Sequence, residues 1–409
     1  MLYVGQEEID ALAAVVRGGK MFRYDPASEC GRFEQRYADF LGVKHVCMTA
    51  SGSMSLTAAL GGLGIGPGCE VIVPSHTYMA TATAVLSIGA IPVIVDVDDS
   101  IMLDPEALDA AVGPRTKAVI PVHMWGAVCD MDAILKVARR HRLKVIEDAC
   151  QCAGGSYHGH RVGSLGHAGA FSFNRYKNMT CGEGGALVTN DPRIAARGRC
   201  MIDCCSYFWS GRRADFKPFA ASGARASEFE GAMLNAQLDR LPVLIARLRA
   251  IKRKVLAATV GGSLAAAPAR DPDGECATTL FYQLPTATAA LEFAQQAGGG
   301  PASRTGRHTY TEWDPILTRH GAFHPALDPF RMPQNKGCRM TYSKTMCRRS
   351  LAILDRTVLI GLSPNQTDAE IDELIRKIRK AAAVCDETAR EQKSPTQPIA
   401  KAATGKGAR

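Results

Sequence analysis

The sequence has no apolar run long enough to cross a membrane. Its most apolar stretch, ATATAVLSIGAIPVIVDV, is interrupted by Pro92 and ends among acids, whereas a membrane-spanning helix needs about 20 consecutive apolar residues. The first residues, MLYVGQEEIDALAAVVRGG, mix acids into an amphipathic pattern and lack the apolar core of a signal peptide. These absences predict a cytoplasmic protein without a membrane partner.

Cysteine pairs at metal-binding spacing are also absent. The chain has 14 cysteines, but none of them lies in a C-x-x-C pair. Because cytosolic thiols stay reduced, we expect these side chains to act as small buried hydrophobic groups. The sequence therefore predicts no metal site.

Acids are missing from two basic stretches, residues 331–349 and 393–409. The net charge is +9, and the second stretch supplies four of these charges through Lys393, Lys401, Lys406 and Arg409. It is rich in Pro, Ala, Gly and Lys, and we expect disorder over residues 386–409. With so much charge in the tail, nucleic acid is not the favoured partner. The first stretch is either a solvated face or a contact for an anionic substrate.

From about residue 45 onward, short apolar runs alternate with helical runs, which is typical of βαβ units and a mostly parallel sheet. The predicted strands are continuous apolar runs, so helices should cover both faces of the sheet. A long helical pattern begins near Ser227 and leads into a mixed region. We predict an α/β fold with a large domain over residues 1–245, including an N-terminal segment 1–25, and a smaller α+β domain over 246–385.

The segment TASGSMSL runs from a predicted strand directly into a predicted helix. Ligands of parallel sheets lie at the carboxyl ends of the strands, and the free N–H groups of a helix start suit a phosphate. Ser51, Gly52 and Ser53 are therefore candidate phosphate contacts. Serine is also a common helix cap, so this segment alone leaves both interpretations open.

The segment VIEDACQ places Glu147 and Asp148 at the end of an apolar strand. A buried carboxylate needs a cationic partner, and the pyridinium nitrogen of pyridoxal phosphate is one such partner. Gln151 can then hydrogen-bond the ring hydroxyl of that cofactor. The alternative is an acid that faces water at a strand end.

Lys177 lies between the apolar run FSFN and the glycine-rich turn GEGG. Lysine is rarely buried without a partner, so we predict that Lys177 is buried because it forms a covalent Schiff base with the cofactor. Ser172 precedes it by five residues, and Tyr78 in PSHTYMATA opens a helix where its ring can stack on a flat cofactor. A surface lysine and a core tyrosine are the alternatives.

Several ordered motifs together resemble those of the DegT/DnrJ/EryC1/StrS aminotransferases. They are GIGPGCEVIVPSHTYMATATAVLSIGAIPVIVDV, PRTKAVIPVHMWG, VIEDACQCAGGSYHGHRVGS and FSFNRYKNMTCGEGGALVTND. The likeness runs from about residue 30 to 245 and more loosely to about 385. It implies pyridoxal phosphate as cofactor and fold type I, in which a mostly parallel seven-stranded sheet lies between helices and a small C-terminal domain follows. It also implies a homodimer with active sites at the interface.

The resemblance assigns cofactor contacts to the residues already singled out. It implies that Lys177 forms the covalent link and that Asp148 binds the pyridine nitrogen. It further implies contacts from Gln151, the Ser51–Ser53 turn, Ser172 and Tyr78. Some relatives are dehydratases with histidine in place of this lysine, so the lysine favours transamination.

Two positions depart from the family pattern. The family usually has G-x-N-x-R-M-S-E before the long helix, with its asparagine reaching the cofactor phosphate of the partner subunit. Here ASGARASE puts Gly223 at that position, and His167 replaces the aspartate usual in GSxGD. A charged hydrogen bond is worth about 1.5–3 kcal/mol, so we expect weaker cofactor binding rather than lost activity.

These observations predict an aminotransferase that moves an amino group from L-glutamate or L-glutamine to a keto sugar, free or nucleotide-linked, or to a keto cyclitol, in antibiotic or surface-glycan biosynthesis. One alternative is a sugar dehydratase or an aminobenzoate-synthase-like lyase of the same family. Another is a non-catalytic regulatory or nucleic-acid-binding relative. His308, Trp313 and His324 are candidate acceptor contacts or ordinary folding residues.

Overall fold

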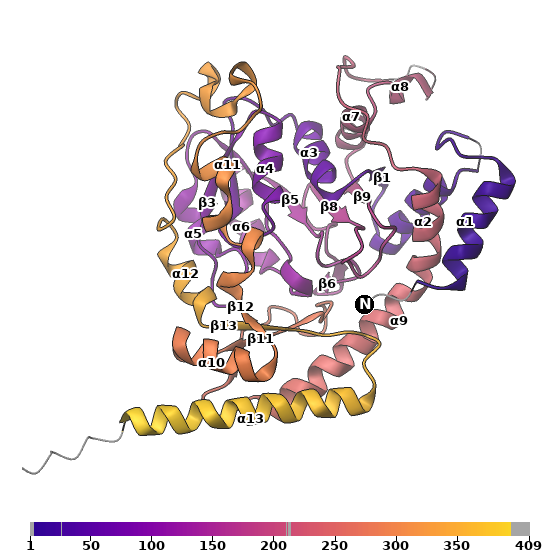
Figure 1. Ribbon diagram of the computed structural model, residues 1–409. Helices are drawn as coiled ribbons and strands as arrows, with labels where there is room; N and C mark the ends of the chain where they lie inside the picture. The colour runs from indigo at the N-terminus through magenta and orange to yellow at the C-terminus, as the bar shows by residue number, and fades with distance from the viewer. Residues whose placement is uncertain (1–3, 26, 210, 212–213, 394–409) are drawn as a thin grey trace, which may run out of the picture.

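The computed structural model describes residues 4–25, 27–209, 211 and 214–393, and a seven-stranded sheet forms its centre (Figure 1). The strands are β1 (His45–Thr49), β2 (Glu70–Pro74), β3 (Ile91–Val95), β4 (Thr116–Val119), β5 (Lys144–Asp148), β8 (Ala168–Ser172) and β9 (Gly185–Thr189). Their order is β1-β9-β8-β5-β4-β2-β3. All neighbours from β3 to β8 are parallel, and only β9 is antiparallel to both of its neighbours. The prediction of a mostly parallel seven-stranded sheet is confirmed.

Helices cover both faces of this sheet. They are α2 (Glu29–Leu41), α3 (Gly52–Gly62), α4 (Ala80–Ser87), α5 (Pro105–Ala111), α6 (Met131–His141) and α7 (Pro192–Ile202). Two further helices, α1 (Gln6–Gly18) and α8 (Ser206–Trp209), contact the long helix α9 (Glu228–Thr259) and α7, respectively. Ala170 and Phe171 are consecutive residues of β8, yet they belong to two different hydrophobic clusters. Because successive strand residues point to opposite faces, each face of the sheet carries its own core. This burial explains why the strands are continuous apolar runs.

A second, antiparallel sheet of four strands follows the long helix α9 (Glu228–Thr259). It has the order β10-β11-β13-β12 and is built from Ala265–Ala266, Thr279–Gln283, Thr357–Gly361 and Gly300–Pro301. Helices α10 (Ala287–Ala297) and α13 (Asp368–Lys393) contact each other beside it (Figure 1). Helix α9 continues without interruption through residue 245, so the division into domains at that point stays a proposal.

The remaining elements are short. They are the hairpin β6 (Ser156–Tyr157) and β7 (His160–Arg161), the 3-10 turn η1 (Met124–Gly126), the helices α11 (Asp314–Leu317) and α12 (Arg348–Asp355), and six 3-10 turns, η2 to η7, between Ala302 and Asn335. The turns carry the chain along the first sheet, where the bridge between His76 and Thr309 attaches it.

The C-terminal helix is longer than we predicted. We expected disorder from residue 386, but α13 continues to Lys393. The segment DETAREQK contains good helix formers and neither Gly nor Pro, so nothing in it ends the helix. The rest of the predicted tail, 394–409, lies outside the described residues. None of the helices in the described part of the chain is both long and apolar enough to span a membrane.

Candidate active site

All eight residues that we predicted as cofactor contacts line one cavity of about 970 Å³. They are Ser51, Gly52, Ser53, Tyr78, Asp148, Gln151, Ser172 and Lys177. Strands β1, β2, β5 and β8 run in the same direction, and these residues lie at or just beyond the carboxyl ends of those strands. The structure thus brings the residues together, while the role of each one remains a proposal.

The first turn of α3 forms one end of the cavity. Ser51 caps the helix, because its hydroxyl accepts a hydrogen bond from the N–H of Met54 at 3.2 Å. The N–H groups of Gly52 and Ser53 belong to the first turn, where a helix has no internal acceptor for them. This arrangement, together with the helix dipole, suits a phosphate group.

Close packing around this turn requires glycine at two positions. A Cβ at Gly52 would lie 2.7 Å from the Cβ of Ser172 and 2.8 Å from the sulfur of Cys150. A Cβ at Gly185 would lie 2.5 Å from the carbonyl carbon of Ser51. Gly185 therefore lets β9 approach the helix start closely.

Asp148 is buried at the end of β5 and is held by hydrogen bonds. Its Oδ2 accepts from the hydroxyl of Thr81 at 2.7 Å, and its Oδ1 accepts from the N–H of Cys150 at 3.1 Å. The hydroxyl of Thr77 lies 2.7 Å from that of Thr81 and extends the chain of hydrogen bonds. None of the ion pairs in the described part of the chain includes Asp148. A buried carboxylate without a cation fits a ligand that brings a protonated ring nitrogen.

Lys177 lines the cavity from the loop between β8 and β9. We predicted a buried lysine, but its side chain is only half-buried, because the cavity leaves space around it. The loop is fixed at its base by hydrogen bonds from the N–H of Arg175 to Gly182 and from the N–H of Lys177 to Asn174. No described ion pair includes Lys177, so its amine is available for a ligand.

Three rings that line the cavity lie next to one another. His308 lies between Tyr78 and Trp125, with ring centroids 5.5 Å and 5.3 Å away. Trp125 has a φ of +46°, a strained left-handed conformation that is often found at functional sites. The backbone N–H of Trp125 donates to the side-chain oxygen of Gln151 at 3.3 Å, which leaves the amide NH₂ of Gln151 for a ligand.

The surroundings of His308 favour its neutral imidazole. Burial lowers its pKa below the ordinary value of 6.5, and the charges of Lys177 and Arg307 lower it further. Its Nδ1 lies 3.2 Å from the carbonyl oxygen of Thr305, which can only accept, so Nδ1 carries the proton. Nε2 is then a hydrogen-bond acceptor.

The other two candidate acceptor contacts do not line the cavity. Trp313 is fully buried, and its indole N–H donates to the carbonyl of Arg307 at 3.0 Å. His324 accepts a hydrogen bond from the N–H of Ala326 in a 3-10 turn. These two residues hold the backbone, whereas His308 lines the cavity.

The basic stretch 331–349 also lies away from the cavity. Three of its six cations form ion pairs with acids of the same chain: Arg331 with Asp328, Arg339 with Glu70, and Arg349 with Asp104. Among the described residues that line the cavity, none comes from this stretch. The stretch therefore anchors the chain against the first sheet.

The two departures from the family pattern lie in different surroundings. His167 is structural, because its Nδ1 accepts from the N–H of Val145 and its own N–H donates back to Val145. Gly223 is exposed, and a Cβ there would meet no atom within 4 Å. The next residue, Ala224, accepts a hydrogen bond from the N–H of Ala50, beside the phosphate turn.

The sequence reasoning missed Thr81, Trp125 and Arg307. Thr77 and Thr81 are four residues apart in HTYMAT, a spacing that favours contact at a helix start. Trp125 is one of three tryptophans and follows the strand-like run KAVIPVHM, which was a usable signal. For Arg307 we find no sequence signal, because it lies far along the chain from Tyr78, whose ring it covers.

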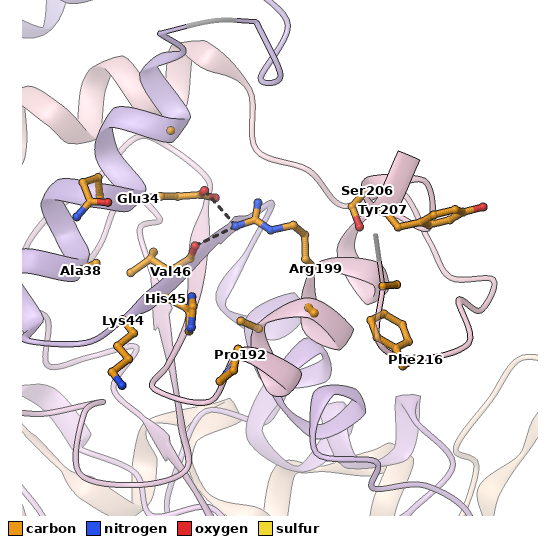
Figure 2. A pocket seen from close by; sticks show the side chains of 15 residues that line it. Glu34, Ala38, Lys44, His45, Val46, Pro192, Arg199, Ser206, Tyr207 and Phe216 are labelled. Carbon is orange, nitrogen blue, oxygen red and sulfur yellow. Dashed lines mark hydrogen bonds and ion pairs between the residues drawn. The ribbon is translucent and has the colours of Figure 1, made fainter. Parts of the chain in front are cut away.

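A second cavity, of about 430 Å³, lies between α2 and α7 (Figure 2). Its half-buried cation, Arg199, pairs with Glu34 at 3.3 Å and donates to the carbonyl of Val46 at 3.2 Å. Burial acts to raise the pKa of Glu34, but the charges of Arg199 and Arg23 outweigh it and hold this pKa below its ordinary value. The charges of Arg199 and Glu34 are thus satisfied within the chain.

Residues 3–282 match the model of the DegT/DnrJ/EryC1/StrS aminotransferase family. Among curated proteins, GDP-perosamine synthase of Caulobacter vibrioides is 45% identical over 51% of this chain and 56% of its own length. L-glutamine:2-deoxy-scyllo-inosose aminotransferase of Streptomyces kanamyceticus is 38% identical over 60% of this chain and 59% of its own length. The chain thus aligns with little more than half the length of these two relatives.

Solved structures match over a larger share of the chain. S. venezuelae DesV has a TM-score of 0.72 at 28% identity and covers 92% of this chain and 94% of its own. The 3-amino-5-hydroxybenzoic acid synthase has a TM-score of 0.75 at 27% identity, with 93% and 97% coverage. Both the large sheet and the second sheet therefore have counterparts in these proteins.

Proposed function

Because the chain belongs to the DegT/DnrJ/EryC1/StrS aminotransferase family, we propose that it transfers an amino group from L-glutamate or L-glutamine to a keto sugar or a keto cyclitol. The relatives support both acceptor classes: one is named for GDP-perosamine and another for 2-deoxy-scyllo-inosose. The second name also specifies glutamine as donor. Antibiotic or surface-glycan biosynthesis is the corresponding context.

The proposed cofactor is pyridoxal phosphate, on which aminotransferases of this family and fold depend. The cavity residues fit it. The start of α3 with Ser172 would hold the phosphate, Asp148 would hold the ring nitrogen, and Gln151 would hold the ring hydroxyl. When bound, the cofactor supplies an electron sink and carries the amino group between donor and acceptor.

In the proposed mechanism, Lys177 moves protons. Its Nζ takes the proton from the α-carbon of the donor and, in the second half-reaction, returns a proton to the carbon of the acceptor. Asp148, fixed by Thr81, would keep a proton on the ring nitrogen of the bound cofactor. Tyr78 and His308 enclose the reacting groups, and the Nε2 of His308 accepts a hydrogen bond from a substrate hydroxyl.

One observation carries this proposal. The half-buried amine of Lys177 and the buried carboxylate of Asp148 line the same cavity as a helix start that suits phosphate. No described ion pair neutralises either charge, whereas the arginine of the second cavity is paired within the chain.

The test is an absorbance titration of the protein supplied with pyridoxal phosphate. The wild type should show the absorbance band of covalently bound cofactor. When glutamate or glutamine is added, this band should change to that of the aminated cofactor. Lys177→Ala should lack both the band and the conversion, and Lys44→Ala, at an exposed lysine outside this cavity, should behave as wild type. A wild type that binds no cofactor, or that responds to neither donor, would overturn the proposal.

A lyase function is the second candidate, because the chain is also similar to 3-amino-5-hydroxybenzoic acid synthase. The two reactions differ in stoichiometry. A transaminase releases one keto acid from the donor for each aminated acceptor, whereas an elimination releases water and consumes no donor. Quantifying keto acid per product therefore separates them.

A homodimer completes the proposal. The family resemblance implies active sites at a subunit interface, and two-fold assemblies are the commonest oligomers. A cytoplasmic location stays a prediction from the sequence.

A further inference from the structure

Two arginines line the active-site cavity without an acidic partner. Arg175 and Arg307 are exposed to the cavity, and neither takes part in an ion pair within the described part of the chain. The acids among the described lining residues are Asp148 and Glu183, and Asp148 is assigned to the cofactor. The cavity therefore has positive charge that Lys177 and the cofactor do not account for.

Arg307 is the better fixed of the two. Its carbonyl accepts hydrogen bonds from the N–H of Met79 at 3.0 Å and from the indole N–H of Trp313 at 3.0 Å. Its guanidinium lies 5.6 Å from the ring centroid of Tyr78, where cation–π attraction limits its motion. Arg175 instead lies over Tyr176, whose side chain is 82% exposed.

Arg307 also lies close to the reacting groups. It lines the same cavity as Lys177, and the ring of Tyr78 beneath its guanidinium lies 5.5 Å from the ring of His308. The charges of Arg307 and Lys177 both act to lower the pKa of that imidazole. The α-carboxylate of an amino donor is attached to the carbon that loses its proton to Lys177. A diphosphate on a sugar is several bonds away from the keto carbon. A cation near Lys177 therefore matches the carboxylate.

We propose that Arg307 binds the α-carboxylate of the amino donor, which glutamate and glutamine share. This inference rests on the proposed transamination. A guanidinium pairs with a carboxylate through two parallel hydrogen bonds, and its position over Tyr78 prepares it for that geometry. Trp313 is then a positioning residue, because it holds the backbone of Arg307.

The test compares two donors in two proteins. The donors are L-glutamate and its α-amide, L-isoglutamine, which lacks the α-carboxylate charge. The proteins are the wild type and Arg307→Gln, each loaded with pyridoxal phosphate. The rate of the absorbance change at several donor concentrations reports the first half-reaction alone.

We expect Arg307→Gln to raise the half-saturating concentration of glutamate by about 10- to 100-fold, the factor for one lost charged hydrogen bond. The wild type should strongly prefer glutamate to isoglutamine, and the variant should lose most of this preference. Arg307→Lys should recover part of this preference, because lysine keeps the positive charge but lacks the planar group that forms two parallel hydrogen bonds. Arg304→Gln, an exposed neighbour outside the cavity lining, should match the wild type.

Two outcomes would overturn the inference while leaving transamination intact. Either Arg307→Gln keeps the wild-type dependence on both donors, or it impairs only the second half-reaction with the acceptor. The latter result would assign Arg307 to an anionic group of the acceptor. If the cofactor absorbance of the wild type changes in the same way without any donor, the proposed function itself fails.

Discussion

Asp148 is the residue whose surroundings most directly demand a ligand. Its carboxylate is buried, receives hydrogen bonds from Thr81 and Cys150, and has no cation among the described residues. Breaking a buried charge pair costs about 3–5 kcal/mol. We therefore expect Asp148→Asn to weaken pyridoxal phosphate binding by at least about 100-fold in a cofactor titration.

Thr81→Val is the graded comparison for this prediction. It keeps the shape of the side chain but removes one hydrogen bond to a charged group, so we expect a loss of about 10-fold. Equal cofactor affinity in wild type and Asp148→Asn would show that the carboxylate does not hold the ring nitrogen.

His76 gives a prediction about pH. Burial is the main cause that lowers its pKa from the ordinary 6.5 to about 3, and the hydrogen bond with the carbonyl of Ile101 only partly opposes this shift. Between these two values the unfolded chain binds more protons than the folded chain. The free energy of unfolding should therefore fall as pH decreases below 6.5, by up to about 1.4 kcal/mol per pH unit from this residue.

Urea unfolding of wild type and His76→Gln at pH 7, 6 and 5 isolates this contribution, because the other titrating groups are common to both proteins. Glutamine does not titrate, so the stability advantage of the wild type should shrink as the pH falls. A constant difference across this range would contradict a neutral, buried His76.

At the residue scale, the sequence led to those site residues that follow a strand directly. Asp148 and Ser172 end β5 and β8, and Lys177 follows five residues later, so strand positions and known motifs were sufficient. Thr309, two residues after Arg307, forms a β-bridge with His76, and this pairing brings Arg307 to the cavity. Such pairing depends on tertiary packing, which periodicity does not encode.

At the scale of elements, Gly52 sets how closely α3 approaches β8. A methyl group at this position would overlap with Ser172 and Cys150, and overpacking of this kind costs about 1–3 kcal/mol. We expect Gly52→Ala to lower both the free energy of unfolding and the affinity for pyridoxal phosphate, measured by urea unfolding and cofactor titration.

Gly18→Ala is the matched control, because a Cβ at this residue of α1 would meet no atom within 4 Å. Alanine should leave the cofactor affinity unchanged there and stabilise the helix slightly. If Gly52→Ala binds the cofactor as tightly as Gly18→Ala, the start of α3 does not set the phosphate site.

The sheet could be predicted because its strands are buried on both faces and therefore read as unbroken apolar runs. The segment from Ala302 to Asn335 could not. It consists largely of 3-10 turns without an apolar period. Its end is held by Asn335, which accepts a hydrogen bond from the N–H of Gly68 and donates to the carbonyls of Gly89 and Pro329. The end of α13 was missed because composition suggested disorder where helix formers prevail.

At the scale of the whole molecule, an exposed aromatic cluster is a candidate contact for the second subunit of the proposed homodimer. Phe22, Tyr24 and Trp209 contact one another at centroid distances of 5.2–5.5 Å, yet Phe22 is 42% and Trp209 50% exposed. Helix α8, which contains Trp209, lies at the edge of the molecule away from the second sheet (Figure 1).

This cluster is linked to the segment that the family resemblance places at a partner's cofactor. The hydroxyl of Tyr24 donates to Asp203 at 2.8 Å, and Asp203 pairs with Arg225 at 3.2 Å, two residues after Gly223. Exposed apolar groups that adjoin such a segment are typical of a protein interface. We therefore place the proposed homodimer contact at this cluster.

The wild type should sediment at twice the mass of the 409-residue chain, and Phe22→Ser/Trp209→Ser should shift it toward the monomer. If the interface also completes the cofactor site, this variant should bind pyridoxal phosphate more weakly, and higher protein concentration should restore part of the affinity. Phe323→Ser removes an equally apolar side chain that is 90% exposed elsewhere, and it should change neither property. A monomeric wild type with full cofactor affinity would show that one chain forms a complete site without Gly223 of a partner.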